Sequence, residues 1–190
     1  MARLRTFIAV ELEKAIRDKV MALQETLART GTDVKWTEPE NLHFTLLFLG
    51  EVDERDVVQV CRAVGECCQQ LEPFGLSVRS AGCFPNPRRP RVLWVGVGQG
   101  VQEMCALHDA LEKPLLKLGC YRREARPYSP HLTLGRVKSD RPTDKLAAAL
   151  AQNAGWQGGD MNAREVRVMS SELTPKGPIY TVLSRAKLGG

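Results

Sequence analysis

The segment His43-Phe44-Thr45-Leu46 recurs later in the chain as His131-Leu132-Thr133-Leu134, and two of the chain's three histidines begin this pattern. Alternating polar and apolar residues are typical of a strand with one buried face, because successive side chains point to opposite faces. The repeat therefore predicts two strands, each with a histidine and a threonine on one face. The opposite face of the first strand is expected to hold Leu42, Phe44, Leu46 and Phe48.

Around these two strands the hydrophobic periodicity predicts further elements. Strands are expected at residues 6–10, 42–49, 75–80, 92–97, 131–137, 165–173 and 180–185. Helices are expected near residues 16–27, 55–71, 104–115 and 144–152, with Asp53 as the N-cap of the second. Because strands and helices alternate but the last two strands are adjacent, the order favours an α+β fold. Its sheets are expected to be mostly antiparallel rather than doubly wound and parallel.

The paired histidines and threonines suit phosphoryl chemistry. An imidazole titrates near neutral pH and acts as an acid or a base there, whereas a hydroxyl donates hydrogen bonds to phosphate oxygens. One histidine would take a proton from water or a ribose hydroxyl, and the other would give its proton to the departing ribose oxygen. This arrangement requires no metal or cofactor. His108 has no threonine companion and is interpreted as structural.

Charge and composition narrow the classes of partner. The formal charge of +5 favours polyanions, although modestly. No apolar run approaches the roughly 20 residues that span a bilayer, so we expect no membrane association and a cytoplasmic location. Basic residues gather at Arg88, Arg89 and Arg91, and around the second histidine segment at Arg122, Arg123, Arg126, Arg136, Lys138 and Arg141.

Beyond the two motifs, several segments resemble a known family, the two-histidine phosphoesterases. Within it the chain is similar to the bacterial and archaeal RNA 2′,3′-cyclic phosphodiesterases, also called 2′-5′ RNA ligases. The likeness runs through Arg5-Thr6-Phe7-Ile8-Ala9-Val10, Asn41–Leu46, Phe48-Leu49-Gly50, Arg91-Val92-Leu93-Trp94 and Arg126–Arg136. The two histidine motifs are specific together, and the other segments support them.

The resemblance implies a fold, an activity and roles for residues. Residues 1–190 would form a single bilobal phosphoesterase domain, pseudo-two-fold, with the active cleft between the lobes. The enzyme would hydrolyse RNA 2′,3′-cyclic phosphate ends to 2′-phosphomonoesters, with 2′-5′ ligation as a secondary activity. His43 would donate the proton to the leaving oxygen, His131 would activate water, and Thr45 and Thr133 would bind the phosphate. RNA with a cyclic phosphate or a 2′-5′ linkage is the expected partner of a monomer that needs no other protein.

Three further residues are candidates for substrate binding. Arg136 is the fifth residue after His131, where the family commonly places an arginine that reaches the substrate phosphate. Strict alternation would turn it away from His131, so a bulge or strand end near Gly135 is needed to direct it into the cleft. Phe48 holds the matching position after His43 and either stacks on a base or belongs to the core. Tyr128 is a similar candidate.

Three rival functions remain open at this stage. A catalytically silent module for RNA ends or nucleotides would bind without turnover, although arginine or lysine would serve binding better than histidine. A metal-dependent phosphohydrolase would lose activity in excess chelator, and two imidazoles with two hydroxyls are a poor ligand set for Mg²⁺ or Zn²⁺. A cyclic phosphodiesterase acting on a small nucleotide stays within the family.

Overall fold

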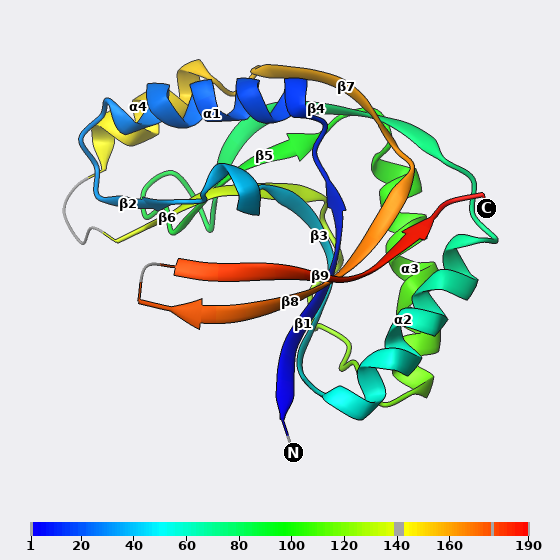
Figure 1. The fold of residues 1–190 in the computed structure, drawn as a ribbon. Coiled ribbons are helices and arrows are strands. Elements are labelled where there is room, and N and C mark those ends of the chain that lie inside the picture. The colour runs from blue at the N-terminus through cyan, green and yellow to red at the C-terminus, as the bar shows by residue number, and fades with distance from the viewer. Residues whose placement is uncertain (1, 139–142, 176, 190) are drawn as a thin grey trace.

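The structure is a computed structural model that describes residues 2–138, 143–175 and 177–189. In these ranges the chain forms one nine-stranded sheet and four α-helices (Figure 1). The strands are β1 (Arg3–Glu11), β2 (Val34–Trp36), β3 (His43–Asp53), β4 (Phe74–Phe84), β5 (Val92–Val97), β6 (His131–Val137), β7 (Gln157–Ala163), β8 (Glu165–Thr174) and β9 (Gly177–Lys187). The helices are α1 (Lys14–Ala28), α2 (Glu54–Cys68), α3 (Val101–Lys117) and α4 (Asp144–Gln152), with a 3₁₀ turn η1 at Pro39–Asn41.

The sheet consists of two halves that meet at the histidine strands. The strand order is β7-β4-β5-β6-β3-β1-β8-β9, with β2 beside β6. Every described pairing is antiparallel, which confirms the predicted α+β class with antiparallel sheet. Between β3 and β6 the paired residues are Phe44 and Leu132, whose side chains are fully buried. Beyond this pair the two strands diverge, and each continues into its own half of the sheet.

The helices are exchanged between the halves. Helix α1 follows β1 in the chain but packs on β7 and α4, in the half that contains β6. Helix α3 follows β5 but packs on β3 and α2, in the half that contains β1. Figure 1 shows α1 beside α4 on one half and α2 beside α3 on the other. Each half therefore contains a helix that follows a strand of the opposite half.

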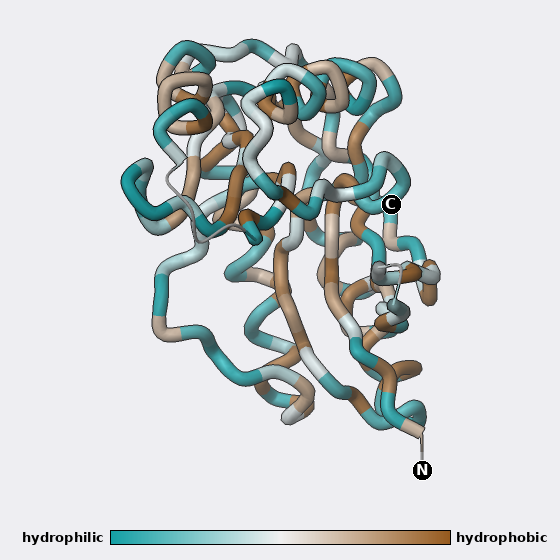
Figure 2. The backbone as a smooth tube through the Cα atoms, turned by 90° about the vertical axis from the view of Figure 1, so that its left-hand side faces the viewer, coloured by the Kyte–Doolittle hydropathy of each residue, from teal (hydrophilic) through white to brown (hydrophobic). Residues whose placement is uncertain are grey.

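Several elements agree closely with the sequence prediction. Strands β5 and β6 and helix α4 have the predicted bounds, and Asp53 caps α2 by accepting a hydrogen bond from the amide of Arg55 at 3.1 Å. Strands β2 and β7 and the turn η1 were not predicted. Long hydrophobic stretches follow the central strands (Figure 2), as expected where a sheet is covered by helices. In the described ranges, none of the helices is both long and apolar enough to cross a membrane.

Candidate active site

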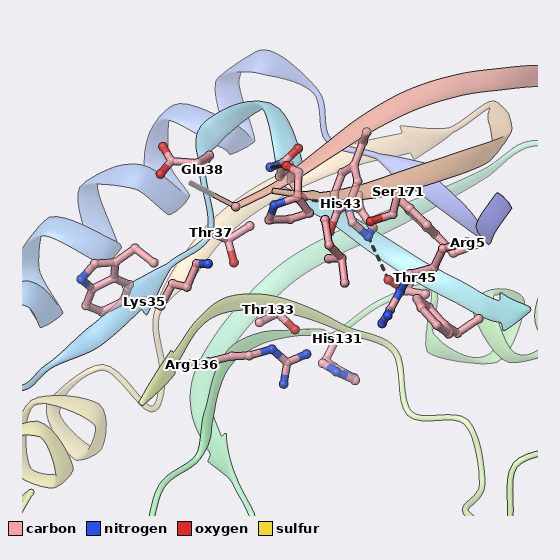
Figure 3. A pocket seen from close by; sticks show the side chains of 18 of the residues that line it. Arg5, Lys35, Thr37, Glu38, His43, Thr45, His131, Thr133, Arg136 and Ser171 are labelled. Atoms are coloured by element: carbon pink, nitrogen blue, oxygen red, sulfur yellow. Dashed lines mark hydrogen bonds between the residues drawn. The ribbon is translucent and has the colours of Figure 1, made fainter. Parts of the chain in front are cut away.

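A cavity of about 390 Å³ lies where β3 and β6 diverge. Figure 3 shows His43 and Thr45 on one side of the cavity and His131, Thr133 and Arg136 on the other. Strand β3 supplies the first pair and strand β6 the second, so the structure brings both predicted motifs together. The remaining lining comes from β1, the β2–η1 segment, the later part of β3, the end of β6 and the β8–β9 hairpin: Arg5, Phe7, Lys35, Trp36, Thr37, Glu38, Asn41, Phe48, Lys138, Ser171, Leu173, Gly177, Pro178 and Tyr180.

Both imidazoles are held in the same way. Nδ1 of His43 bonds to the carbonyl oxygen of Asn41 at 2.7 Å, and Nδ1 of His131 bonds to the carbonyl oxygen of Ser129 at 2.8 Å. A carbonyl only accepts hydrogen bonds, so Nδ1 carries the proton in each ring. In the neutral form, Nε2 is then the proton acceptor. The carbonyl thus fixes the tautomer and the orientation of each imidazole.

The surroundings of His43 favour its neutral form. Its ring stacks on Phe7 with centroids 4.9 Å apart, and the ring of Tyr180 approaches edge-on at 5.5 Å. Burial among these rings lowers the pKa of His43 to about 4, although the bond to Asn41 acts in the opposite direction. With this pKa His43 is an acceptor at neutral pH. The donor role that the resemblance implies requires His43 to take up a proton from solution when an anionic substrate binds beside it.

The two threonines differ in their contacts. Oγ1 of Thr45 lies 2.9 Å from Nε2 of His43, and it donates to this nitrogen when the imidazole is neutral. Thr133 is half-buried and lines the opposite side of the cavity. A substrate phosphate that enters between the strands would compete with Nε2 of His43 for the hydroxyl proton of Thr45.

Matched bulges direct two of the predicted substrate residues into the cavity. On β3, Thr45 pairs with Ala9 and Leu47 with Ile8, so Leu46 is an extra residue. On β6, Thr133 pairs with Trp94 and Gly135 with Leu93, so Leu134 is the extra residue at the equivalent position. A bulge shifts the alternation of side chains by one residue. Phe48 and Arg136, each five residues after a histidine, therefore line the cavity.

For Phe48 this geometry corrects the prediction that it faces away from His43. Its side chain is 40% exposed, so it does not belong to the core. The guanidinium of Arg5 lies over its ring at 4.9 Å from the centroid, and Phe7 stacks behind it at 6.4 Å. The bulge at Leu46, which strict alternation does not include, is the physical reason. Phe48 thus offers an aromatic surface on the strand that carries His43 and Thr45.

Tyr128 lies outside the cavity lining. Its hydroxyl donates to the carbonyl oxygen of Thr45 at 3.1 Å, and its ring stacks on His108 with centroids 4.4 Å apart and planes 5° apart. Burial raises the pKa of Tyr128, so the hydroxyl remains a donor. The segment before β6 is thereby fastened to the backbone of β3. The position favours support of Thr45 over contact with a base.

Sequence reasoning did not single out Arg5, Tyr180, Lys35 and Trp36 as site residues, although all four line the cavity. Burial raises the pKa of Tyr180, whereas the charges of Arg136 and Arg5 act in the opposite direction. Tyr180 is therefore within electrostatic reach of arginines from both halves of the sheet. Arg5 belongs to one of the segments that resemble the family, and this resemblance could have identified it as a site residue. The others lie on short or terminal strands where no motif marked them.

Only some of the residues in the predicted basic clusters lie at the cavity. Of the cluster around the second histidine, Arg136 and Lys138 line the cavity, whereas Arg123 pairs with Glu112 at 2.7 Å. Arg141 lies outside the described residues. Across the parts of the chain that the structure describes, no three His, Cys, Asp or Glu side chains come close enough to hold a metal ion. The chemistry available in the cavity is that of imidazoles, hydroxyls and cations.

Comparison with known proteins agrees with this geometry. The family described as LigT like Phosphoesterase matches residues 10–94 and again residues 95–180, so each match contains one histidine motif. The RNA 2′,3′-cyclic phosphodiesterase of Methanothermobacter thermautotrophicus is 44% identical, covering 94% of this chain and 96% of its own. The protein of the same name from Archaeoglobus fulgidus is 41% identical, with coverage of 93% and 96%.

Solved structures show the same fold. A protein of Thermus thermophilus is 28% identical and superimposes with a TM-score of 0.84 over 98% of this chain and 99% of its own. Escherichia coli LigT, crystallised with 3′-AMP, is 25% identical and reaches a TM-score of 0.78 over 99% of both chains. Two family matches that together span most of the sequence, with relatives above 40% identity, establish that this chain belongs to the LigT-like phosphoesterase family.

Proposed function

We propose that this protein is an RNA 2′,3′-cyclic phosphodiesterase that opens the cyclic end to a 2′-phosphomonoester without a metal ion. The observation that carries the proposal is the matched pair of histidines. Each is fixed through Nδ1 by the carbonyl two residues earlier, and both line one cavity with a threonine beside each. The names of the relatives at 44% and 41% identity support the substrate class.

The reaction is an in-line displacement at phosphorus. Water attacks the phosphorus, the bond to the ribose 3′-oxygen breaks, and the phosphate stays on the 2′-oxygen. One imidazole takes the proton from water and the other gives a proton to the departing 3′-oxygen, which together restore the charge balance. We assign the donor role to His43 and the acceptor role to His131. Binding of the anionic substrate raises the pKa of His43, which burial lowers to about 4.

Hydroxyls and cations complete the transition-state site. Thr45 and Thr133 donate to the phosphate oxygens, where negative charge develops. Arg136, directed inward by the bulge at Leu134, lines the same cavity and reaches a phosphate of the substrate. With a ribose 5′-hydroxyl in the place of water, the same steps would join two RNA ends through a 2′-5′ linkage, as a secondary activity. We further propose that the enzyme is a monomer without an obligate protein partner and acts on RNA in the cytoplasm.

The test is turnover of a short RNA ending in a 2′,3′-cyclic phosphate, in excess chelator, with the 2′- and 3′-phosphate products separated. We expect the 2′-phosphate, and a loss of about 10²-fold or more in His43→Ala and in His131→Ala. Thr45→Ala and Thr133→Ala should lose less. The matched control is His108→Ala, which removes the third histidine from outside the cavity and should retain most of the activity.

Each rival function predicts a different result. Activity that disappears with chelator would favour a metal-dependent phosphohydrolase. Tight binding without turnover would favour a silent RNA-end module. Turnover of cyclic mononucleotides alone, with RNA ends left intact, would favour the small-nucleotide enzyme. Full activity in either histidine variant would exclude the paired mechanism.

A further inference from the structure

Three cations lie together beside the catalytic groups, on the β2–β6 edge of the cavity. Lys35 of β2 is the direct cross-strand partner of Arg136 of β6, and Lys138 follows two residues later, where its amide donates to the carbonyl of Asp33 at 2.8 Å. All three side chains line the cavity. Like charges placed opposite each other on a sheet destabilise it unless an anion lies between them.

Among the residues that the structure describes, no group neutralises these cations. Within the described residues, none of the three side chains forms an ion pair or a hydrogen bond with another protein group. Glu38 contributes one carboxylate to the cavity lining, against four cationic side chains that include Arg5. The edge therefore has an excess of positive charge that an anion from solution can balance.

An aromatic ring accompanies the cations. Trp36 lies against Gly135 of β6 so closely that a Cβ at that glycine would stand 3.1 Å from Cε3 of the indole and 3.0 Å from the carbonyl oxygen of Lys35. The glycine thus lets β2 and its tryptophan approach the bulged strand. The indole is half-buried and lines the cavity, which gives a flat surface next to the three cations. Alternating cations and aromatic faces are how proteins bind single-stranded nucleic acid.

The position of this group matches a second phosphate. Because of the bulge at Leu134, Thr133 and Arg136 pair with Trp94 and Val92, which are two residues apart on β5. At about 3.3 Å per residue, Arg136 and its partner Lys35 therefore lie roughly 7 Å along the sheet from Thr133. That distance separates them from the phosphate held between the histidines. The cyclic phosphate occupies the 2′ and 3′ oxygens of the terminal ribose, and the next phosphate of the same substrate is attached on the 5′ side.

We propose that Lys35 and Lys138, together with Arg136 and Trp36, form a second subsite for the phosphate on the 5′ side of the terminal ribose, with Trp36 stacking on the preceding base. This inference rests on the proposed function and specifies its substrate. The substrate is a single-stranded oligonucleotide, and a cyclic mononucleotide without a 5′-phosphate occupies only part of the site. Two sources supply this chemistry, the internal linkage of an RNA and a 5′-phosphorylated cyclic mononucleotide.

The experiment compares three substrates: adenosine 2′,3′-cyclic phosphate, its 5′-phosphorylated form, and an ApA dinucleotide with the cyclic end. For the wild type we expect kcat/KM to rise about tenfold with the 5′-phosphate, and further with the dinucleotide. In the Lys35→Ala/Lys138→Ala double variant, the ratio between the 5′-phosphorylated and the minimal substrate should fall towards one. Lys117→Ala, an exposed lysine on α3 away from the cavity, should keep both the ratio and the activity.

Two further measurements separate the contribution of the cations to kcat/KM from that of stacking on Trp36. The slope of log(kcat/KM) for the dinucleotide against log[salt] should become shallower by about one for each cation removed. Trp36→Leu should lose the extra gain of the dinucleotide but keep the gain from the 5′-phosphate, and Trp36→Phe should retain part of both. An equal gain for the two phosphorylated substrates would assign the subsite to small nucleotides.

The same three substrates distinguish a missing second subsite from a missing phosphodiesterase activity. If the wild type does not hydrolyse any of the three substrates, the proposed function fails. If all three are hydrolysed with equal kcat/KM, or if the double variant keeps the wild-type ratio, the second subsite is overturned and the activity stands.

Discussion

Asn41 links the ring of His43 to the β8–β9 hairpin through two hydrogen bonds. Its carbonyl oxygen accepts the Nδ1 proton of His43 at 2.7 Å, and its side-chain amide donates to the carbonyl of Pro178 at 3.1 Å. The asparagine is 7% exposed, so the bond to Pro178 is shielded from water. The β8–β9 hairpin and the imidazole of His43 are thus joined through one buried residue.

Substitution of Asn41 by alanine should therefore lower turnover without removing any group that contacts the substrate phosphate. The carbonyl of Pro178 loses its donor, at a cost of about 1–3 kcal/mol in the free energy of unfolding. The hairpin can then shift relative to His43, and we expect kcat to fall about tenfold. Asn153→Ala is the matched control, because Asn153 also donates to a carbonyl, that of Ala149, away from the cavity. Equal kcat in the two variants would contradict the positioning role.

The protonation of His43 should depend on whether the cavity is occupied. Burial lowers the pKa of His43 to about 4. A phosphate anion bound next to the ring favours the protonated, charged form. We expect the ¹⁵N resonances of His43, assigned by their loss in His43→Ala, to titrate near pH 4. In the presence of adenosine 2′-monophosphate the midpoint should rise by about one unit or more. A midpoint that does not move would assign the acceptor role to His43 and the donor role to His131.

The same low pKa links stability to pH. The ordinary imidazole in the unfolded chain has a pKa of 6.5, so the unfolded state binds more protons than the folded state between pH 6.5 and about 4. The free energy of unfolding therefore falls as the pH drops through this window, by about 3 kcal/mol in all. His43→Asn keeps a donor near the Asn41 carbonyl but does not titrate. Urea unfolding of both proteins at pH 7, 5.5 and 4 should show that the free energy of unfolding falls less with pH in the variant than in the wild type. An equal pH dependence in the two proteins would contradict the lowered pKa of His43.

Tyr128 supports the phosphate-binding strand through a single hydroxyl. Tyr128→Phe removes the hydrogen bond to the carbonyl of Thr45 but keeps the stack on His108. We expect a loss of about 1 kcal/mol in stability and a fall in kcat of about three- to tenfold. Tyr121→Phe is the control, because this buried tyrosine bonds to the backbone of Glu124 and lies outside the cavity. It should lose stability but not kcat, and a similar fall in kcat for both would contradict the role of Tyr128.

The strands that carry His43 and His131 could be predicted because polar and apolar side chains alternate from each histidine to the threonine two residues later. Strand β6 begins at His131 and ends at Val137 as predicted. The short strand β2 was missed, since three residues carry no periodic signal and pairing with β6 determines its conformation. Strand β7 was missed because its sequence, QGGDMNA, has the composition of a loop, and it forms by pairing with β4.

The cavity was only partly predictable for a related reason. A bulge is decided by the partner strand, so the alternation within β3 alone placed Phe48 on the wrong face. The adjacent buried residues Leu46 and Leu47 are the one local trace of the extra residue. Lys35 reaches the cavity through its pairing with Arg136, far away in the chain. Tyr180 reaches it because the β8–β9 hairpin pairs with the distant strand β1, and a single sequence does not reveal either pairing.

The exchange of α1 and α3 between the halves has a consequence for how the protein comes apart. The chain passes back and forth between the halves, so no continuous fragment contains one complete half with its own helices. A fragment ending at Val97, for example, contains β3 but lacks the helix α3 that covers it. We expect residues 1–190 to melt in one calorimetric transition and limited proteolysis to release no stable half. The distance between His43 and His131 is then maintained for as long as the whole domain stays folded.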